Sequence, residues 1–96
     1  MFHHVVMLHF RDTLSEEDCK YINDACDTLR ELPGVITLQF VSNCSERAFG
    51  YTHAFVSSFV DSAAHDHYQQ TPLHAPLKQK IKEITDQVVV LDYETP

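Results

Sequence analysis

Two side chains suited to acid–base catalysis lie six residues apart, in the segment Tyr-Gln-Gln-Thr-Pro-Leu-His. Tyr68 precedes Pro72 and His74 follows it. Proline removes a backbone donor and disfavours helix in the preceding residue, so Pro72 interrupts the helix that carries Tyr68. The interruption allows both side chains to face one cavity, where a phenol and an imidazole form a suitable acid and base pair. The other interpretation is that Tyr68 packs in the core while His74 caps the next helix.

Seven histidines occur in this chain of 96 residues, and two of them fall on apolar faces of predicted strands. His4 alternates with Val6 and Leu8, and His53 alternates with Phe55. Imidazoles among apolar side chains have perturbed pKa values and need hydrogen-bond partners. Two interpretations stay open: core histidines satisfied by each other or by the backbone, or the polar end of an apolar ligand pocket.

The spacing of the other histidines does not favour a metal site. His65 and His67 stand two apart on a predicted helix, so their rings point to different sides. His3 and His9 share a strand face but lie too far apart to share an ion. No H-E-x-x-H, G-x-G-x-x-G, P-loop or G-x-S-x-G motif occurs. The sequence therefore predicts no metal and no cofactor, and gives no support to serine hydrolysis.

The elements that must position these side chains follow from the periodicity of the apolar residues. Strands are predicted at residues 2–10, 35–42, 51–60 and 87–93. Helices are predicted at about residues 15–32, at 63–70 and at 74–84. The first strand carries apolar side chains on both faces, so we expect it in the centre of the sheet.

The order β-α-β-β-α-β predicts an α+β, ferredoxin-like fold, with an antiparallel sheet and both helical segments on one face. Beneath the helices, the predicted ligand-binding residues are His4, Val6, Leu8, His53, Phe55, Val88 and Val90. We expect them to line a small, mostly apolar pocket.

The opposite face of the predicted sheet has no helix to cover it. Its expected apolar side chains are Val5, Met7, Ala54, Val56, Val89 and Leu91. This surface is too apolar to remain in water, and a two-fold partner would bury it against its own sheet. The sequence therefore predicts a homodimer through the open face, which makes a dimeric α+β barrel.

Length and composition limit the class of protein. A chain of 96 residues suffices for a single domain, spanning 1–96, and 44% hydrophobic with 22% charged residues is ordinary for a globular protein. The net charge of −7 and the scattered Lys and Arg residues disfavour a nucleic-acid partner. No apolar run approaches the roughly 18 residues of a membrane span, and no signal-peptide pattern opens the chain. We therefore expect no membrane partner and a cytoplasmic location.

Four short motifs occur in a characteristic order along the chain. They are His-His-Val-Val-Met-Leu-His-Phe at 3–10, Gly-Tyr-Thr-His-Ala at 50–54, Tyr-x-x-Thr-Pro-Leu-His at 68–74 and Val-Leu-Asp-Tyr at 90–93. They resemble the first strand, the third strand, the Y-x-x-H-P-x-H signature and the closing strand of the stress-responsive A/B barrel domain (Dabb) family. The resemblance covers nearly the whole chain and implies a dimeric α+β barrel.

The resemblance also implies a site. One relative in the family, a plant polyketide cyclase that forms olivetolic acid, performs a cofactor-free aldol condensation with a tyrosine and a histidine that match Tyr68 and His74. Two further pocket histidines of that enzyme match His4 and His53. The resemblance thus implies that His74 removes a proton from a carbon between carbonyls. Tyr68 would hydrogen-bond the carbonyl oxygen as negative charge builds there.

The chain departs from the family pattern at three positions. Thr71 replaces the first histidine of the signature, and Lys78 and Gln79 stand where a cyclase pocket would have apolar lining. The cyclase substrate therefore does not follow. We expect a small apolar or aromatic ligand, with cyclase- or lyase-like chemistry by His74 and Tyr68.

Two alternatives remain: a non-catalytic, stress-linked structural or binding protein, and a cofactor-free monooxygenase. A pocket large enough for an aromatic ligand, with the side chains of His74 and Tyr68 facing it, would favour a catalytic function. A pocket filled by Phe55, Leu29 and Leu77 favours the non-catalytic one.

Overall fold

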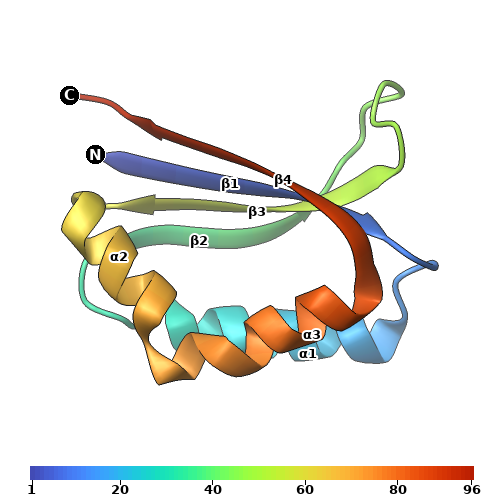
Figure 1. Ribbon diagram of the computed structural model, residues 1–96, viewed down its shortest axis with the longest axis horizontal. Coiled ribbons are helices and arrows are strands. Elements are labelled where there is room, and N and C mark those ends of the chain that lie inside the picture. Colours follow the sequence, from blue (N-terminus) through green and yellow to red (C-terminus); the bar gives the residue numbers. More distant parts are fainter.

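The structure, a computed structural model that describes all residues 1–96, has four strands, three α-helices and one short 3-10 helix (Figure 1). The strands are β1 (Phe2–Phe10), β2 (Val35–Ser42), β3 (Tyr51–Phe59) and β4 (Thr85–Glu94). The helices are α1 (Glu16–Leu29), α2 (Ser62–Gln70), η1 (Pro72–His74) and α3 (Ala75–Ile84).

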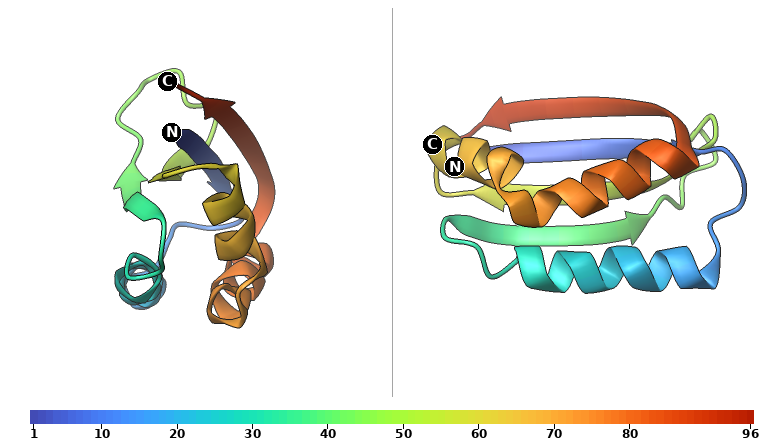
Figure 2. Two further views of the ribbon diagram at one scale, coloured as in Figure 1. Left: turned by 90° about the vertical axis from the view of Figure 1, so that its left-hand side faces the viewer. Right: turned by 60° about the horizontal axis from the view of Figure 1, so that its bottom comes forward.

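The strands form one antiparallel sheet in the order β2-β3-β1-β4. Strand β1 lies inside the sheet, as its two apolar faces predict. All helices lie on one side of the sheet, with α1 beside α3, and the other side has no covering element (Figure 2). The fold is therefore ferredoxin-like α+β, as the element order predicts.

The first helix is shorter than predicted. Ser15 accepts a hydrogen bond from the Asp18 backbone N–H at 3.0 Å, which begins α1. The helix ends at Leu29, three residues before the predicted end. Pro33 disfavours helical backbone in the residue before it, and Gly34 then adopts a φ of +83°. These two residues turn the chain into β2.

The last strand is longer than predicted, because it begins at Thr85 directly after α3. The Arg11 backbone N–H donates to the Ile84 carbonyl oxygen at 2.9 Å, and Phe10 pairs with Thr85 after a register shift. At the other end, the Met1 amino group donates to the Thr95 carbonyl oxygen at 2.6 Å. The two chain ends consequently lie side by side (Figure 1).

The hydrophobic core lies between the sheet and the helices. Its buried members are Leu8, Phe10, Ile22, Cys26, Leu29, Leu38, Phe55, Phe59, Tyr68 and Leu77. Every strand except β4 contributes to this set. The side of β4 that faces the helices is therefore free to border a cavity.

The uncovered face of the sheet is apolar, as predicted. Val56, Val89 and Leu91 are 37%, 50% and 55% exposed there. They come from β3 and β4, on either side of β1. Ala54 shares this face but is buried, because its side chain is short. No helix of this chain has the length and apolar character needed to cross a membrane.

Candidate functional site

A cavity of about 500 Å³ lies between the sheet and the segment formed by α2, η1 and α3. Its apolar walls come from both layers and include Val6, Phe55, Leu77, Ile81, Val88 and Val90. Thr85 and Gln87 of β4 and several charged side chains line it as well. An apolar cavity with a few polar groups is the usual form of a small-molecule site.

The break at Pro72 brings Tyr68 and His74 together at this cavity. Thr71 has an extended backbone (φ −63°, ψ 137°) and separates α2 from η1. Both rings line the cavity, and their centroids lie 4.3 Å apart with the planes tilted by 36°. Both interpretations of Tyr68 therefore hold in part, because Tyr68 packs in the hydrophobic core and also borders the cavity.

His74 is buried without a partner for one of its nitrogens. Its Nδ1 is the single buried side-chain nitrogen or oxygen in the chain that makes no hydrogen bond. Burial, assisted by the positive charge of Lys78, lowers the pKa of His74 to about 4. Near neutral pH the ring is therefore uncharged and able to accept a proton or a hydrogen bond from a ligand.

Tyr68 is held in its protonated form. Burial raises the pKa of Tyr68, and the neighbouring Cys26 thiol adds to this shift. A phenol of raised pKa keeps its proton and serves as a hydrogen-bond donor. Tyr68 and His74 thus present a donor and an acceptor to the same cavity.

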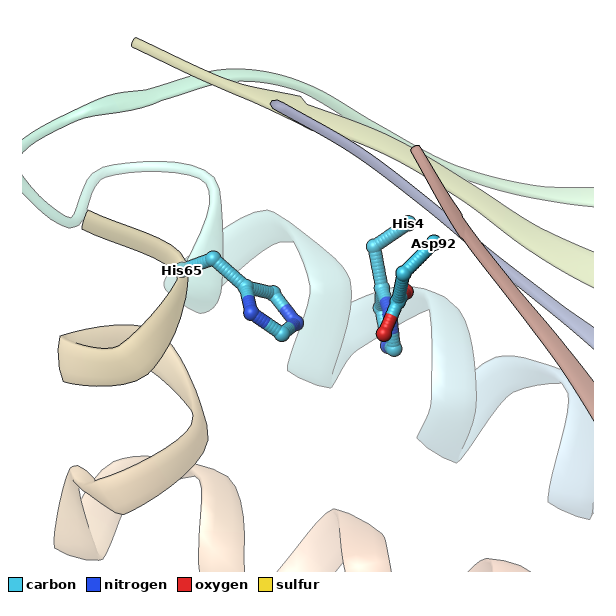
Figure 3. A group of neighbouring side chains, drawn as sticks. All are labelled: His4, His65 and Asp92. Atoms are coloured by element: carbon cyan, nitrogen blue, oxygen red, sulfur yellow. The ribbon is translucent and has the colours of Figure 1, made fainter. Parts of the chain in front are cut away.

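A polar network holds His4 at one end of the cavity (Figure 3). Its Nδ1 is hydrogen-bonded to the Asp92 carboxylate, and its Nε2 lies 3.2 Å from the Gln69 amide nitrogen. The same amide nitrogen lies 3.3 Å from His65 Nε2. An amide nitrogen only donates, so both Nε2 atoms accept from it and His4 Nδ1 donates to Asp92.

His4, His65 and Asp92 also have the composition of a metal site. One ligand atom from each residue can be chosen so that all three lie within 4.8 Å of one another (Figure 3). Imidazole and carboxylate suit Zn²⁺ and other first-row ions. In this structure both Nε2 atoms accept from Gln69, so an ion bound through them would have to displace that amide. The absence of a metal stays a prediction.

Three members of the polar network around His4 were not predicted from the sequence: Asp92, Gln69 and His65. They lie on β4 and α2, far from His4 in the chain. For Asp92 a signal existed, because it alternates with Val88 and Val90 and pairs with His4 in the register. For Gln69 and His65 no local signal existed, because only the docking of α2 brings them to β1.

Two of the predicted ligand-binding residues lie outside the cavity. Leu8 is completely buried in the core. His53 stacks on Phe40 at 5.1 Å between centroids, and its Nδ1 is hydrogen-bonded to the Thr52 hydroxyl at 2.9 Å. Burial lowers the pKa of His53. The other five, His4, Val6, Phe55, Val88 and Val90, line the cavity.

The expectation that His4 and His53 satisfy each other is wrong. His4 pairs with Ser57 across the sheet, whereas His53 pairs with Leu8. Four residues of strand separate the two pairs, which is roughly 13 Å. Each histidine instead bonds to a polar side chain near it, Asp92 and Thr52 respectively.

Comparison with known families agrees with this architecture. The model of the family described as Stress Responsive A/B Barrel Domain (Dabb) matches residues 2–95. The chain belongs to the Dabb family. No curated protein matches this Dabb chain in a sequence comparison.

Solved structures with the same fold extend the comparison. The Arabidopsis thaliana protein At3g17210 is 25% identical, with a TM-score of 0.84 over 100% of this chain and 96% of its own. A dimeric ferredoxin-like protein of unknown function from Jannaschia sp. CCS1 is 25% identical, with a TM-score of 0.86 over 98% of each chain. A hydroxynitrile lyase from Passiflora edulis is 20% identical, with a TM-score of 0.83 over 99% of this chain and 93% of its own. The last comparison bears on the fold alone.

Proposed function

We propose that this Dabb domain binds a small apolar or aromatic carbonyl compound in the cavity beneath its helices. We further propose that His74 and Tyr68 act on it by cofactor-free acid–base chemistry, of the cyclase or lyase type. One observation carries the proposal. The buried, uncharged imidazole of His74 and the buried phenol of Tyr68 lie with their ring centroids 4.3 Å apart, and both border a cavity of about 500 Å³.

The reaction steps follow from the two protonation states. His74 accepts a proton from a carbon beside a carbonyl, and the electron pair moves onto the carbonyl oxygen. Tyr68 donates a hydrogen bond to that oxygen as negative charge develops there. In a cyclisation, the carbanion forms a carbon–carbon bond with a second carbonyl, and His74 returns its proton to the new alkoxide. A lyase reaction runs these steps in reverse, beginning with removal of the hydroxyl proton.

The low pKa of His74 selects for a particular kind of substrate. With a pKa of about 4, the empty site holds a weak base. A forming enolate beside the ring stabilises the imidazolium and raises this pKa, because opposite charges favour the charged form. We therefore expect substrates whose C–H bond is already acidified by a carbonyl and whose negative charge forms close to His74.

The open cavity supports this proposal over a non-catalytic structural role. Phe55 and Leu77 form part of the wall and Leu29 packs in the core, yet the volume of about 500 Å³ remains. A volume in this range accommodates a small aromatic molecule. A Passiflora hydroxynitrile lyase of the same fold is an example of a lyase on this scaffold, at an identity that transfers no residue role. No observation favours a monooxygenase.

We also propose that the chain forms a homodimer through the uncovered sheet face. The exposed side chains Val56, Val89 and Leu91 support a second sheet packed against them. Relatives of the same fold from Jannaschia and Thermobifida fusca are described as dimeric. The cavity lies on the opposite side of the sheet, so each copy would keep its own site.

A thermal-shift experiment with acetophenone as the probe tests the ligand proposal. A ligand that binds the folded state alone raises the melting temperature in proportion to its saturation. We expect a rise for the wild type and no rise for Val90→Phe, because the larger ring fills part of the cavity. Val60→Phe is the control, since Val60 is 55% exposed, close to the 51% of Val90, and does not line the cavity.

Each shift is measured against the ligand-free melting temperature of the same variant. Absence of any rise for the wild type would contradict ligand binding. An undiminished rise for Val90→Phe would place the bound probe outside this cavity.

A further inference from the structure

The basic residues of this acidic chain fall into two groups. Seven Lys and Arg residues stand against fourteen Asp and Glu residues. Three of the seven form ion pairs, each 2.7 Å long: Lys20 with Asp24, Arg30 with Asp27, and Lys80 with Asp18. The remaining cations make no ion pair, and three of these four, Arg11, Lys78 and Lys82, line the same cavity.

The fold brings these three residues to the lining of one cavity. Lys78 and Lys82 are four residues apart on α3 and therefore lie on one face of the helix. Arg11 follows β1, and its backbone N–H donates to the Ile84 carbonyl oxygen at the end of that helix. Like charges at this helical spacing repel one another, so without a counter-ion the arrangement weakens the helix.

The acidic side chains of the cavity lining do not balance the three cations. Asp86 is the one acidic residue in the lining, and one of its oxygens is hydrogen-bonded to His9 Nδ1 at 2.6 Å, so a single carboxylate stands against three cations. Lys78 uses one N–H on the Gln69 carbonyl oxygen at 2.5 Å, and an ammonium carries two more. An anion held here would complete the coordination of these groups.

We propose that the ligand of this cavity carries a carboxylate, which binds between Lys78, Lys82 and Arg11. This inference rests on the proposed function and narrows its substrate class to apolar or aromatic keto acids. The apolar walls take the body of the ligand, and the carboxylate stays at the partly exposed rim with the three cations. Such a ligand places its carbonyl toward Tyr68 and His74.

The charge of Lys78 also reaches His74, because it contributes to lowering the pKa of that imidazole. A carboxylate bound at Lys78 neutralises this contribution and makes His74 a stronger base. Binding of the acid and activation of the base are therefore linked. A neutral ketone would not provide this effect.

The test compares two probes of nearly equal size, 4-acetylbenzoate and 4-acetylbenzamide, by isothermal titration calorimetry. Exposed ion pairs are individually weak, so three together predict about tenfold tighter binding of the acid. The Lys78→Gln/Lys82→Gln variant keeps Arg11, so it is expected to lose most of this preference and retain about a twofold one. Lys20→Gln/Lys80→Gln is the matched control, because it also removes two positive charges, neither of which lines the cavity. It should retain the preference.

Each outcome has a distinct meaning. Equal binding of both probes by the wild type overturns the carboxylate proposal but leaves the proposed function standing. A preference as strong in the Lys78→Gln/Lys82→Gln variant as in the wild type also overturns it, because the anion then binds elsewhere. If neither probe binds, the proposed function fails and the carboxylate proposal fails with it.

Discussion

The imidazole of His74 makes the free energy of unfolding depend on pH. Burial lowers its pKa in the folded state to about 4, from an ordinary value of 6.5. Between these two values the unfolded chain binds more protons than the folded one, so stability falls as pH falls. From pH 7.5 to pH 5 we expect a loss of about 2 kcal/mol from this residue.

Urea unfolding of the wild type and of His74→Gln at both pH values measures this contribution. Glutamine is polar but does not titrate, so the variant should lose less stability than the wild type between pH 7.5 and pH 5. Equal losses in the two proteins would show that His74 titrates normally in the folded state.

The amide of Gln69 stabilises two buried histidines. It lies within 3.3 Å of the Nε2 atoms of both His4 and His65, which are buried. Gln69→Leu leaves two buried acceptors without a donor, which costs roughly 1–3 kcal/mol for each such group. The exposed Gln70→Leu should change the free energy of unfolding by less than about 0.5 kcal/mol. Similar effects of both variants on urea unfolding would contradict the network.

Single residues could be predicted from the sequence only where a local signal marked them. Pro72 indicated that Tyr68 and His74 could face one cavity, because a helix break changes where side chains point, but the sequence left the alternative of a core tyrosine and a capping histidine open. Strand alternation placed Val6, Val88 and Val90 on the covered face, where they line the cavity. Alternation also placed Leu8 and His53 on this face. Both lie outside the cavity, because the face is larger than the cavity. His53 stacks on Phe40 instead.

At the scale of the element, Gly34 allows α2 to approach the turn after α1. Its φ is +83°, and a Cβ added to it would lie 2.5 Å from the Ala64 Cβ. Gly34→Ala combines backbone strain with a clash, for an expected cost of roughly 2–4 kcal/mol. The cost should fall when Gly34→Ala is made in an Ala64→Gly background, because the clash is then removed. Purely additive costs in this double-mutant cycle would contradict the close approach.

The order and type of the elements could be predicted because each has its own period and its own start or stop signal. Ser15, Asp61 and Pro72 mark the helix ends directly. The predicted ends of α1 and β4 were wrong by two or three residues. Pro33 acts on the residues before it, and Thr85 joins the sheet only through its pairing with Phe10.

At the scale of the whole molecule, the uncovered sheet face predicts association. Light scattering coupled to size exclusion should give the wild type twice the 11.0 kDa mass of one chain. Leu91→Glu puts a charge on the proposed interface and should give the single-chain mass. Leu73→Glu is the control, since Leu73 is equally exposed but lies in the helical layer. A wild type of single-chain mass would contradict the dimer.

The proposed chemistry depends on His74 removing a proton from a carbon beside a carbonyl. Proton–deuterium exchange into the methyl group of acetophenone, followed by NMR in D₂O near neutral pH, measures this step directly. We predict that the wild type accelerates exchange over buffer, and that His74→Ala loses about 100-fold or more of that acceleration. The exposed His67→Ala should retain it. Exchange no faster than in buffer for the wild type, or an undiminished rate for His74→Ala, would contradict proton removal by His74.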